Sequence, residues 1–216
     1  MTSATGVAVV FLATLLATPC AIRASTAGDA ALAKFSAAWD AVHTYTCAIS
    51  AHEVRGSDVQ DRVYHVAFAR PHTMRADIVA GAGRGGAAIW TGGDTLYGHQ
   101  GGFLSFVRMH LNIHDPRAVS LRGTTVAQVS FGALLERFEH LKTSALDAKE
   151  AGGLTTVTAA VSDPDTEMGV TAEVLILGAN HIPVEYDQYQ GERVVDRVRY
   201  SDYKENVPLP ASTWKI

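Results

Sequence analysis

Cysteine is nearly absent from this sequence. Only Cys20 and Cys47 occur among its 216 residues. Cys20 lies in the segment interpreted below as an export signal, which leaves Cys47 without an intrachain disulfide partner. A chain of this length can bury enough core to fold without disulfides. Because Cys47 alternates with Tyr45 and Ile49, as on the buried face of a strand, we predict a buried structural thiol and not a nucleophile.

The sequence also lacks an apolar run long enough to span a bilayer. Its most apolar stretch, Val7–Ala17, has 11 residues, about half of what a membrane helix requires. Small residues follow at Ala24–Ala27, as at a signal-peptide cleavage site. We therefore predict a signal peptide at residues 1–27, a single domain at residues 28–216, and a periplasmic location. No Lys or Arg precedes the apolar run, so an uncleaved membrane anchor is the alternative.

An excess of positive charge is missing as well. The chain has 18 basic and 22 acidic residues, for a formal net charge of −4. Removal of residues 1–27 takes away one charged residue, Arg23. Proteins that bind nucleic acids, or that dock by charge on anionic membranes, carry basic surfaces. We therefore expect neither a nucleic-acid partner nor charge-driven membrane docking.

Two helices are predicted from apolar residues that recur at spacings of three and four. The first covers Gly28–His43, with Phe35 and Trp39 on its buried face. The second covers Thr125–Lys142, where Gln128 completes a capping-box pattern at the start.

Strands are predicted on both sides of the second helix, from short alternating segments bounded by turn residues. They are Tyr45–Val54, Val59–Ala69, Thr73–Val79, Gly86–Thr91, Thr95–His99 and Leu104–Leu111 before that helix, and Leu154–Val161, Val170–Leu177, Ile182–Gln190 and Val194–Tyr203 after it. The polar residues 108–119 are interpreted as mostly loop. Connections of hairpin length indicate a single antiparallel sheet.

Two helices are too few to cover both faces of such a sheet. We therefore predict an α+β fold with a large curved antiparallel sheet, an incomplete β-barrel, and helices covering its concave side. Side chains that point inward from every second strand position would line an apolar cavity.

Patterns that indicate catalysis or metal binding are weak. Gly81–Gly86 matches G-x-G-x-x-G, but a strand is predicted after it where a phosphate-binding loop requires a helix. His110 and His114 have the spacing of metal ligands on a helix, but the residues around them favour a loop. Glu53 and Asp61 are interpreted as solvated turn acids. We expect no enzyme activity, no catalytic residue, no metal and no cofactor.

Several short motifs resemble those of a family of exported proteins. They are Tyr45-Thr-Cys47 followed by His52-Glu53 and Gly56, Phe68-Ala-Arg-Pro71 before Met74-Arg75, Trp90-Thr-Gly-Gly, and Tyr200-Ser-Asp-Tyr203 with Asn206 and Leu209-Pro210. With the order of elements, they make residues 28–216 similar to the outer-membrane lipoprotein carrier (LolA/LolB-like) superfamily, in a periplasmic branch. The resemblance implies an incomplete barrel with a helical lid and a cavity for acyl chains, lipoproteins or hydrophobic peptides. It transfers no functional residue, and the superfamily also includes envelope sensors and a cofactor-free enzyme.

Apolar side chains at inward positions are the candidate ligand contacts. They are Trp39, Val66, Phe68, Met74, Trp90 and Phe106. The predicted function is a periplasmic carrier or binding protein for a lipid, a lipoprotein acyl chain or another apolar ligand. Two alternatives are an envelope sensor or accessory protein that recognises a protein partner, and a small cofactor-free enzyme. An uninterrupted apolar lining favours the carrier, an apolar patch outside the cavity favours the sensor, and titratable groups inside it favour the enzyme.

Overall fold

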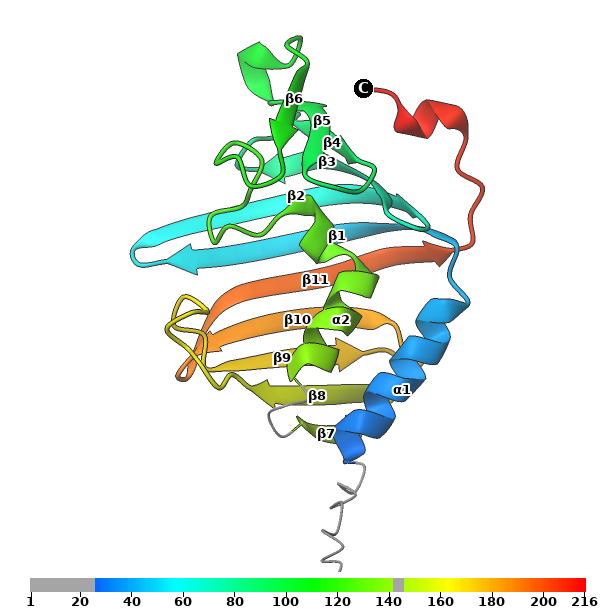
Figure 1. Cartoon of the computed structure of the whole chain (residues 1–216), viewed down its shortest axis with the longest axis vertical. Helices are drawn as coiled ribbons and strands as arrows, with labels where there is room; N and C mark the ends of the chain where they lie inside the picture. The colour runs from blue at the N-terminus through cyan, green and yellow to red at the C-terminus, as the bar shows by residue number, and fades with distance from the viewer. Residues whose placement is uncertain (1–25, 142–145) are drawn as a thin grey trace, which may run out of the picture.

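The computed structural model describes residues 26–141 and 146–216, which form one antiparallel sheet and two α-helices (Figure 1). The elements are α1 Ala27–Asp40, β1 Thr44–Arg55, β2 Asp58–Ala69, β3 Thr73–Gly81, β4 Ala87–Trp90, β5 Thr95–His99, η1 Gly102–Leu104, β6 Met109–Asn112, η2 Val126–Val129, α2 Phe131–Leu141, β7 Leu146–Ala151, β8 Leu154–Ala160, β9 Ala172–Leu177, β10 Pro183–Gln190, β11 Arg193–Glu205 and η3 Ala211–Trp214. The apolar run of the predicted signal peptide lies outside the described residues. Within them, no helix is long and apolar enough to cross a membrane.

The order of the strands is β6-β5-β4-β3-β2-β1-β11-β10-β9-β8-β7. The chain runs outward from β1 to β6 in consecutive antiparallel hairpins, crosses back over the sheet, re-enters at the opposite edge as β7 and returns to the centre as β11 (Figure 1). Residues 113–130 make this return before α2, and we call them the crossing segment. The edges β6 and β7 do not pair with each other, so the predicted incomplete barrel of α+β class is confirmed.

Both helices pack on the same face of the sheet, which we call the inner face. They lie across the half formed by β7–β11 (Figure 1). Trp39 of α1 and Phe131 of α2 are buried there. The ring of Tyr45 stacks on both Phe68 and Phe131, with centroid distances of 5.0 and 4.7 Å. The main apolar core therefore lies beneath the two helices.

The start of α1 is fixed by a capping box. The Thr26 side chain accepts a hydrogen bond from the Asp29 backbone N–H at 3.1 Å, and the Asp29 carboxylate accepts one from the Thr26 backbone N–H at 2.8 Å. At the other end, Arg70 donates to the carbonyl oxygens of Trp39 and Val42, both at 2.6 Å. These contacts satisfy backbone groups that a helix end leaves unpaired.

The predicted helix Thr125–Lys142 is wrong in its first turn and a half, while its end at Lys142 lies outside the described residues. The expected capping box between Thr125 and Gln128 is present, but it starts the 3-10 turn η2. Ser130 then has an extended backbone, and its hydroxyl accepts from Ala133 N at 3.1 Å. Because this local bond caps a new helix, the predicted helix is interrupted at Ser130 and α2 begins at the next residue.

Two errors concern strands. The predicted strand Leu104–Leu111 is wrong in its first part, because the 3-10 turn η1 comes first and the short β6 pairs with β5 only from Met109 onward. The edge strand β7 was missed, since its sequence is rich in Ala, Asp, Glu and Lys. It pairs with β8, and the turn between the two strands is formed by Gly152 and Gly153, which both have positive φ, as a tight two-residue hairpin requires.

Candidate functional site: a cavity beneath the crossing segment

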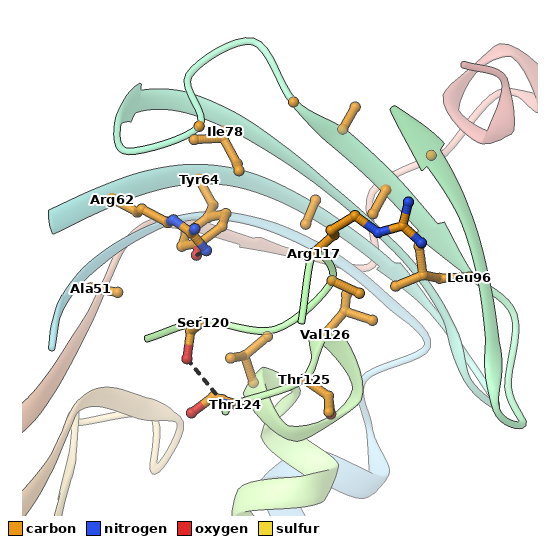
Figure 2. Close-up of a pocket in the computed structure, with 18 of the residues that line it drawn as sticks. Ala51, Arg62, Tyr64, Ile78, Leu96, Arg117, Ser120, Thr124, Thr125 and Val126 are labelled. Atoms are coloured by element: carbon orange, nitrogen blue, oxygen red, sulfur yellow. Dashed lines mark hydrogen bonds between the residues drawn. The ribbon is translucent and has the colours of Figure 1, made fainter. Parts of the chain in front are cut away.

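A cavity of about 340 Å³ lies between the inner face of β1–β6 and the crossing segment. Its size is near the lower end of small-molecule pockets, which run from about 300 to 1,000 Å³. Figure 2 shows Tyr64, Ile78 and Leu96 on the curved strands, facing Thr125 and Val126 across the hollow. The two α-helices cover the other half of the sheet. The half that borders the cavity is covered by the crossing segment, which is irregular apart from the 3-10 turn η2.

Small residues create the space. Ala51 on β1 lines the cavity, as do the cross-strand partners Ala76 on β3 and Ala88 on β4. On β5 the corresponding wall residue is Gly98, where a Cβ atom would collide with the carbonyl oxygen of Ala87. The hollow remains because these side chains are too short to reach the crossing segment. Larger apolar side chains complete the wall: Ile49, Val66, Ile78, Leu96, Met109, Leu111, Val126, Val129 and Val198.

The crossing segment is fastened to the end of the β1–β2 hairpin. The Ser120 hydroxyl donates to a Glu53 carboxylate oxygen and accepts from Thr124 N at 3.0 Å. Leu121 N donates to the Gln60 side-chain oxygen at 3.1 Å. Arg122 Nη1 donates to the carbonyl oxygen of Val54 at 3.0 Å. These bonds hold one end of the roof, while the stretch toward β6 has fewer ties to the sheet.

Acidic groups line the end of the cavity next to this attachment. Glu53 on β1 and Asp196 on β11 are direct cross-strand partners, and they are 4% and 3% exposed. Burial, and then the neighbouring Glu53, raise the pKa of Asp196 to about 7, while Arg122 acts in the opposite direction. Burial also raises the pKa of Tyr64. Arg62 on β2, His99 on β5 and Arg117 on the crossing segment also line the cavity, so the lining is mainly apolar but carries ionisable groups of both signs.

The structure disperses the six candidate ligand contacts. Val66 lines the cavity. Phe68 and Met74 are 2% and 0% exposed and belong to the packed core. Trp39 is 7% exposed, and Arg70 lies 4.5 Å from the centre of its ring. None of these three large side chains is among the residues that line the cavity, because they fill the space beneath the helices.

The remaining two candidates lie outside the cavity lining. Trp90 is half-buried at the edge of the core, and its indole nitrogen donates to the carbonyl oxygen of Gly93 at 2.8 Å. Phe106 is 70% exposed, beside Phe103, which is 89% exposed. The two rings meet edge to face at 6.1 Å.

Two groups in the acidic end were missed from the sequence. Glu53 is not a solvated turn acid, because it continues the inward alternation of Ile49 and Ala51. Asp196 alternates in the same way with Val198. That alternation was the available signal. Asp61 does lie in solvent, with its side chain 71% exposed and 2.7 Å from His52.

The other motifs take ordinary structural positions. Gly81–Gly86 covers the end of β3 and the turn that leads to β4, as predicted, and part of it borders the cavity. His110 lies on β6 with its ring 4.8 Å from that of Tyr97, and His114 follows the strand. Among the described residues, no three His, Cys, Asp or Glu side chains gather as metal ligands would. Cys47 is buried, as expected, and burial raises the pKa of its thiol to about 12.

Comparison with known proteins gives matches among solved structures only. No family model matches the chain, and no curated protein matches it. A LolA superfamily protein of Nitrosomonas europaea is 12% identical, with 88% of this chain and 97% of that chain covered and a TM-score of 0.44. Lipoprotein LppX of Mycobacterium tuberculosis is 12% identical, with 84% and 98% covered and a TM-score of 0.40.

A third similar structure is a complex of two proteins, MucA and MucB, from Pseudomonas aeruginosa. It is 8% identical, with 88% of this chain and 60% of that chain covered and a TM-score of 0.44. The solved structures similar to this chain thus include members of the superfamily that its motifs resemble. Likeness of this degree concerns the fold, and it assigns no ligand or partner to this chain.

Proposed function

We propose that this chain is an exported binding protein, without enzymatic activity, that holds an apolar ligand such as a lipid or acyl chain in the cavity under the crossing segment. The observation that carries the proposal is the hollow itself. A stretch of sheet with Ala and Gly at its inward positions faces a roof that does not fill the space. Burial of each methylene of a ligand there would contribute about 0.8 kcal/mol.

The contrast within the sheet supports this proposal. Folding normally packs inward positions to the density of an organic crystal. Under the helices the chain does so with Phe and Leu side chains. Under the crossing segment it leaves about 340 Å³ open. An apolar hollow of this size costs stability, and a bound ligand would restore the missing contacts.

The test is the affinity of an uncharged apolar fluorophore such as N-phenylnaphthylamine for matched variants. Ala76→Phe places a ring in the cavity, so we expect at least about a tenfold loss of affinity. Ala80→Phe makes the same change on the same strand at an exposed position outside the cavity. It should bind as the wild type does. Equal affinity in the wild type and in a folded Ala76→Phe protein would contradict the proposal.

A second candidate function is recognition of a protein partner. The observation that favours it is the exposed pair Phe103 and Phe106 between β5 and β6, with Val107 also partly exposed. Exposed apolar side chains in a cluster often mark a binding surface. A Phe103→Ser, Phe106→Ser double variant separates the two functions. Loss of a co-purified envelope protein with unchanged fluorophore affinity would favour the sensor or accessory function.

The enzyme alternative has a weaker basis. Titratable groups do line the cavity, as an active site would require. However, among the described residues the hydroxyl paired with a carboxylate there is that of Ser120, which also accepts from Thr124 N. Both bonds fasten the crossing segment, so we interpret this pair as structural.

A further inference from the structure

One carboxylate in the cavity wall lacks a partner. Asp196 is 3% exposed and lines the cavity, and its Oδ1 atom has no hydrogen-bond partner among the described residues. Buried polar atoms in folded proteins are nearly always hydrogen-bonded, so an unpaired one on a side chain that lines a hollow points to a missing donor.

The neighbouring acids show that Asp196 is an exception. Cross-strand pairing places Glu53, Asp196, Gln188 and Glu173 in one row across β1, β11, β10 and β9. Glu53 accepts from Ser120. Glu173 accepts from Arg137 of α2, at 2.6 Å for the shortest bond. Glu173, under α2, and Glu53, under the crossing segment, thus have hydrogen-bond partners. Asp196 lies between them in the row and lines the cavity.

Arg122 does not supply the missing donor. It is 4% exposed, and its Nη1 atom donates a hydrogen bond to the carbonyl oxygen of Val54. Its Nε and Nη2 atoms are themselves without partners, and no ion pair joins it to Asp196 among the contacts of the described residues. The side chain therefore moderates the charge of the acid pair without occupying the position in front of Asp196.

Beyond the acid pair the wall is mainly apolar, with Ala76, Ala88, Leu96 and Met109 along it, although Arg62, His99 and Arg117 also line the cavity. A ligand that matches both parts has a hydrogen-bond donor with positive charge at one end and a hydrocarbon chain behind it. We propose that the cavity binds a single-chain amphiphile with a primary ammonium head, the head at Asp196 and Glu53 and the chain along the alanine-lined wall. This inference rests on the proposed binding function and specifies its ligand class.

Charge linkage gives the site a pH dependence. The charged groups that act on Asp196 include Glu53 on β1, Arg122 on the crossing segment, Asp187 on β10 and Glu173 on β9. The phenols of Tyr64, Tyr186 and Tyr200 also interact with it, and burial raises the pKa of each of them. Arg197 offsets Asp187 through two hydrogen bonds. Because the pKa of Asp196 is about 7, the carboxylate is mostly ionised at pH 8 and mostly protonated at pH 6. An alkylammonium ion stays charged over this range, so it should bind more tightly at pH 8.

The test compares three probes with one eight-carbon chain: octylammonium, octanol and octanoate. Each displaces N-phenylnaphthylamine from the wild type, from Asp196→Asn and from the control Asp61→Asn, whose site is solvated on β2. At pH 8 we expect octylammonium to bind the wild type about tenfold more tightly than octanol, the gain typical of a charge-assisted hydrogen bond. Asp196→Asn should bring this ratio close to one, and Asp61→Asn should leave it unchanged.

A measurement on the wild type alone gives a second readout. The ratio of octylammonium to octanol affinity should fall between pH 8 and pH 6. Equal affinity of octylammonium and octanol at pH 8, tighter binding of octanoate through Arg62, or an unchanged ratio in Asp196→Asn would each overturn the ammonium assignment while the binding function stands. If neither the fluorophore nor any octyl probe binds, the cavity-binding function and this inference both fail.

Discussion

The strands β7–β11 and β2–β6 belong to one sheet, yet they lie under different covers. Where α1 and α2 cover the sheet, side chains such as Phe138 of α2 and Leu175 of β9 are fully buried in a close-packed core. Beneath the crossing segment, inward side chains such as Ala76 and Ala88 leave a hollow. The alternation of the strands is similar in both halves. What differs is side-chain volume and the regularity of the cover, and this difference separates the part that stabilises the fold from the part available to a ligand.

The largest expected effect is on the packed half. Phe138→Ala removes a ring that is 0% exposed and should lower the free energy of unfolding by about 3–5 kcal/mol. Leu96→Ala makes a comparable truncation in the hollow half, where the side chain already borders open space. Its cost should stay at or below about 2 kcal/mol, the low end for such changes. Urea denaturation of both variants measures the difference, and equal costs would contradict the contrast between the halves.

A pH effect should come from the boundary between the halves. The raised pKa of Asp196, about 7, lies above its value in the unfolded chain. The folded state therefore binds the proton more tightly, and this group makes stability fall as pH rises from about 4 to about 7. Asp196→Asn should flatten that slope and raise stability at pH 8 by on the order of 2–4 kcal/mol. Thermal melts at several pH values test this, and an unchanged slope would refute it.

The cap of α1 gives a smaller effect on the packed half. Because the Thr26 hydroxyl accepts from Asp29 N, Thr26→Ala should lower the free energy of unfolding by about 1 kcal/mol.

The same bond makes the stability of the exported protein depend on where the signal peptide is cleaved. Cleavage after Ala24 keeps Thr26, whereas cleavage after Ala27 removes it. We expect a protein that starts at Ser25 to melt at a higher temperature than one that starts at Gly28, and N-terminal sequencing of the exported protein identifies the site used.

The smallest effect should be a gain of stability in the hollow half. Ala51→Val adds two methyl groups at a cavity-lining position and should stabilise the fold by about 0.5–1 kcal/mol while it weakens fluorophore binding. Chemical denaturation and probe titration of the same sample measure both. A loss of stability would show that the space at Ala51 is already filled.

Much of this architecture could be predicted from local patterns. Alternation and turn residues identified ten of the strands at least in part, and apolar spacing identified both helices. The edge strand β7 escaped because its exposed side chains carry little alternation. The interruption of the helix at Ser130 was not predicted, because a serine between regularly spaced apolar residues gives no strong signal for a helix end, although its hydroxyl can cap a new helix.

The cavity itself was harder to foresee. Large aromatic residues such as Trp39 and Phe68 were the candidates, yet large side chains fill space and small ones leave it. Whether an alanine lies opposite a phenylalanine or an open hollow depends on which segment crosses above it. That is a tertiary property, absent from the strand's own sequence. Glu53 was interpreted as solvated for a similar reason, because its burial depends on the crossing segment and Ser120.

The most direct test of the central claim is to map where an apolar ligand contacts the chain. An alkyl diazirine probe is photolysed with the exported protein, with and without an excess of a plain alkanol that competes for the site. Labelled residues are identified by peptide mass spectrometry, and a competed label is one that the alkanol suppresses. We predict that competed labels fall on β2–β5 and the crossing segment, around Val66, Ala76 and Leu96. Competed labels on α2 and β9, around Phe138 and Leu175, or an absence of any competed label, would contradict the account.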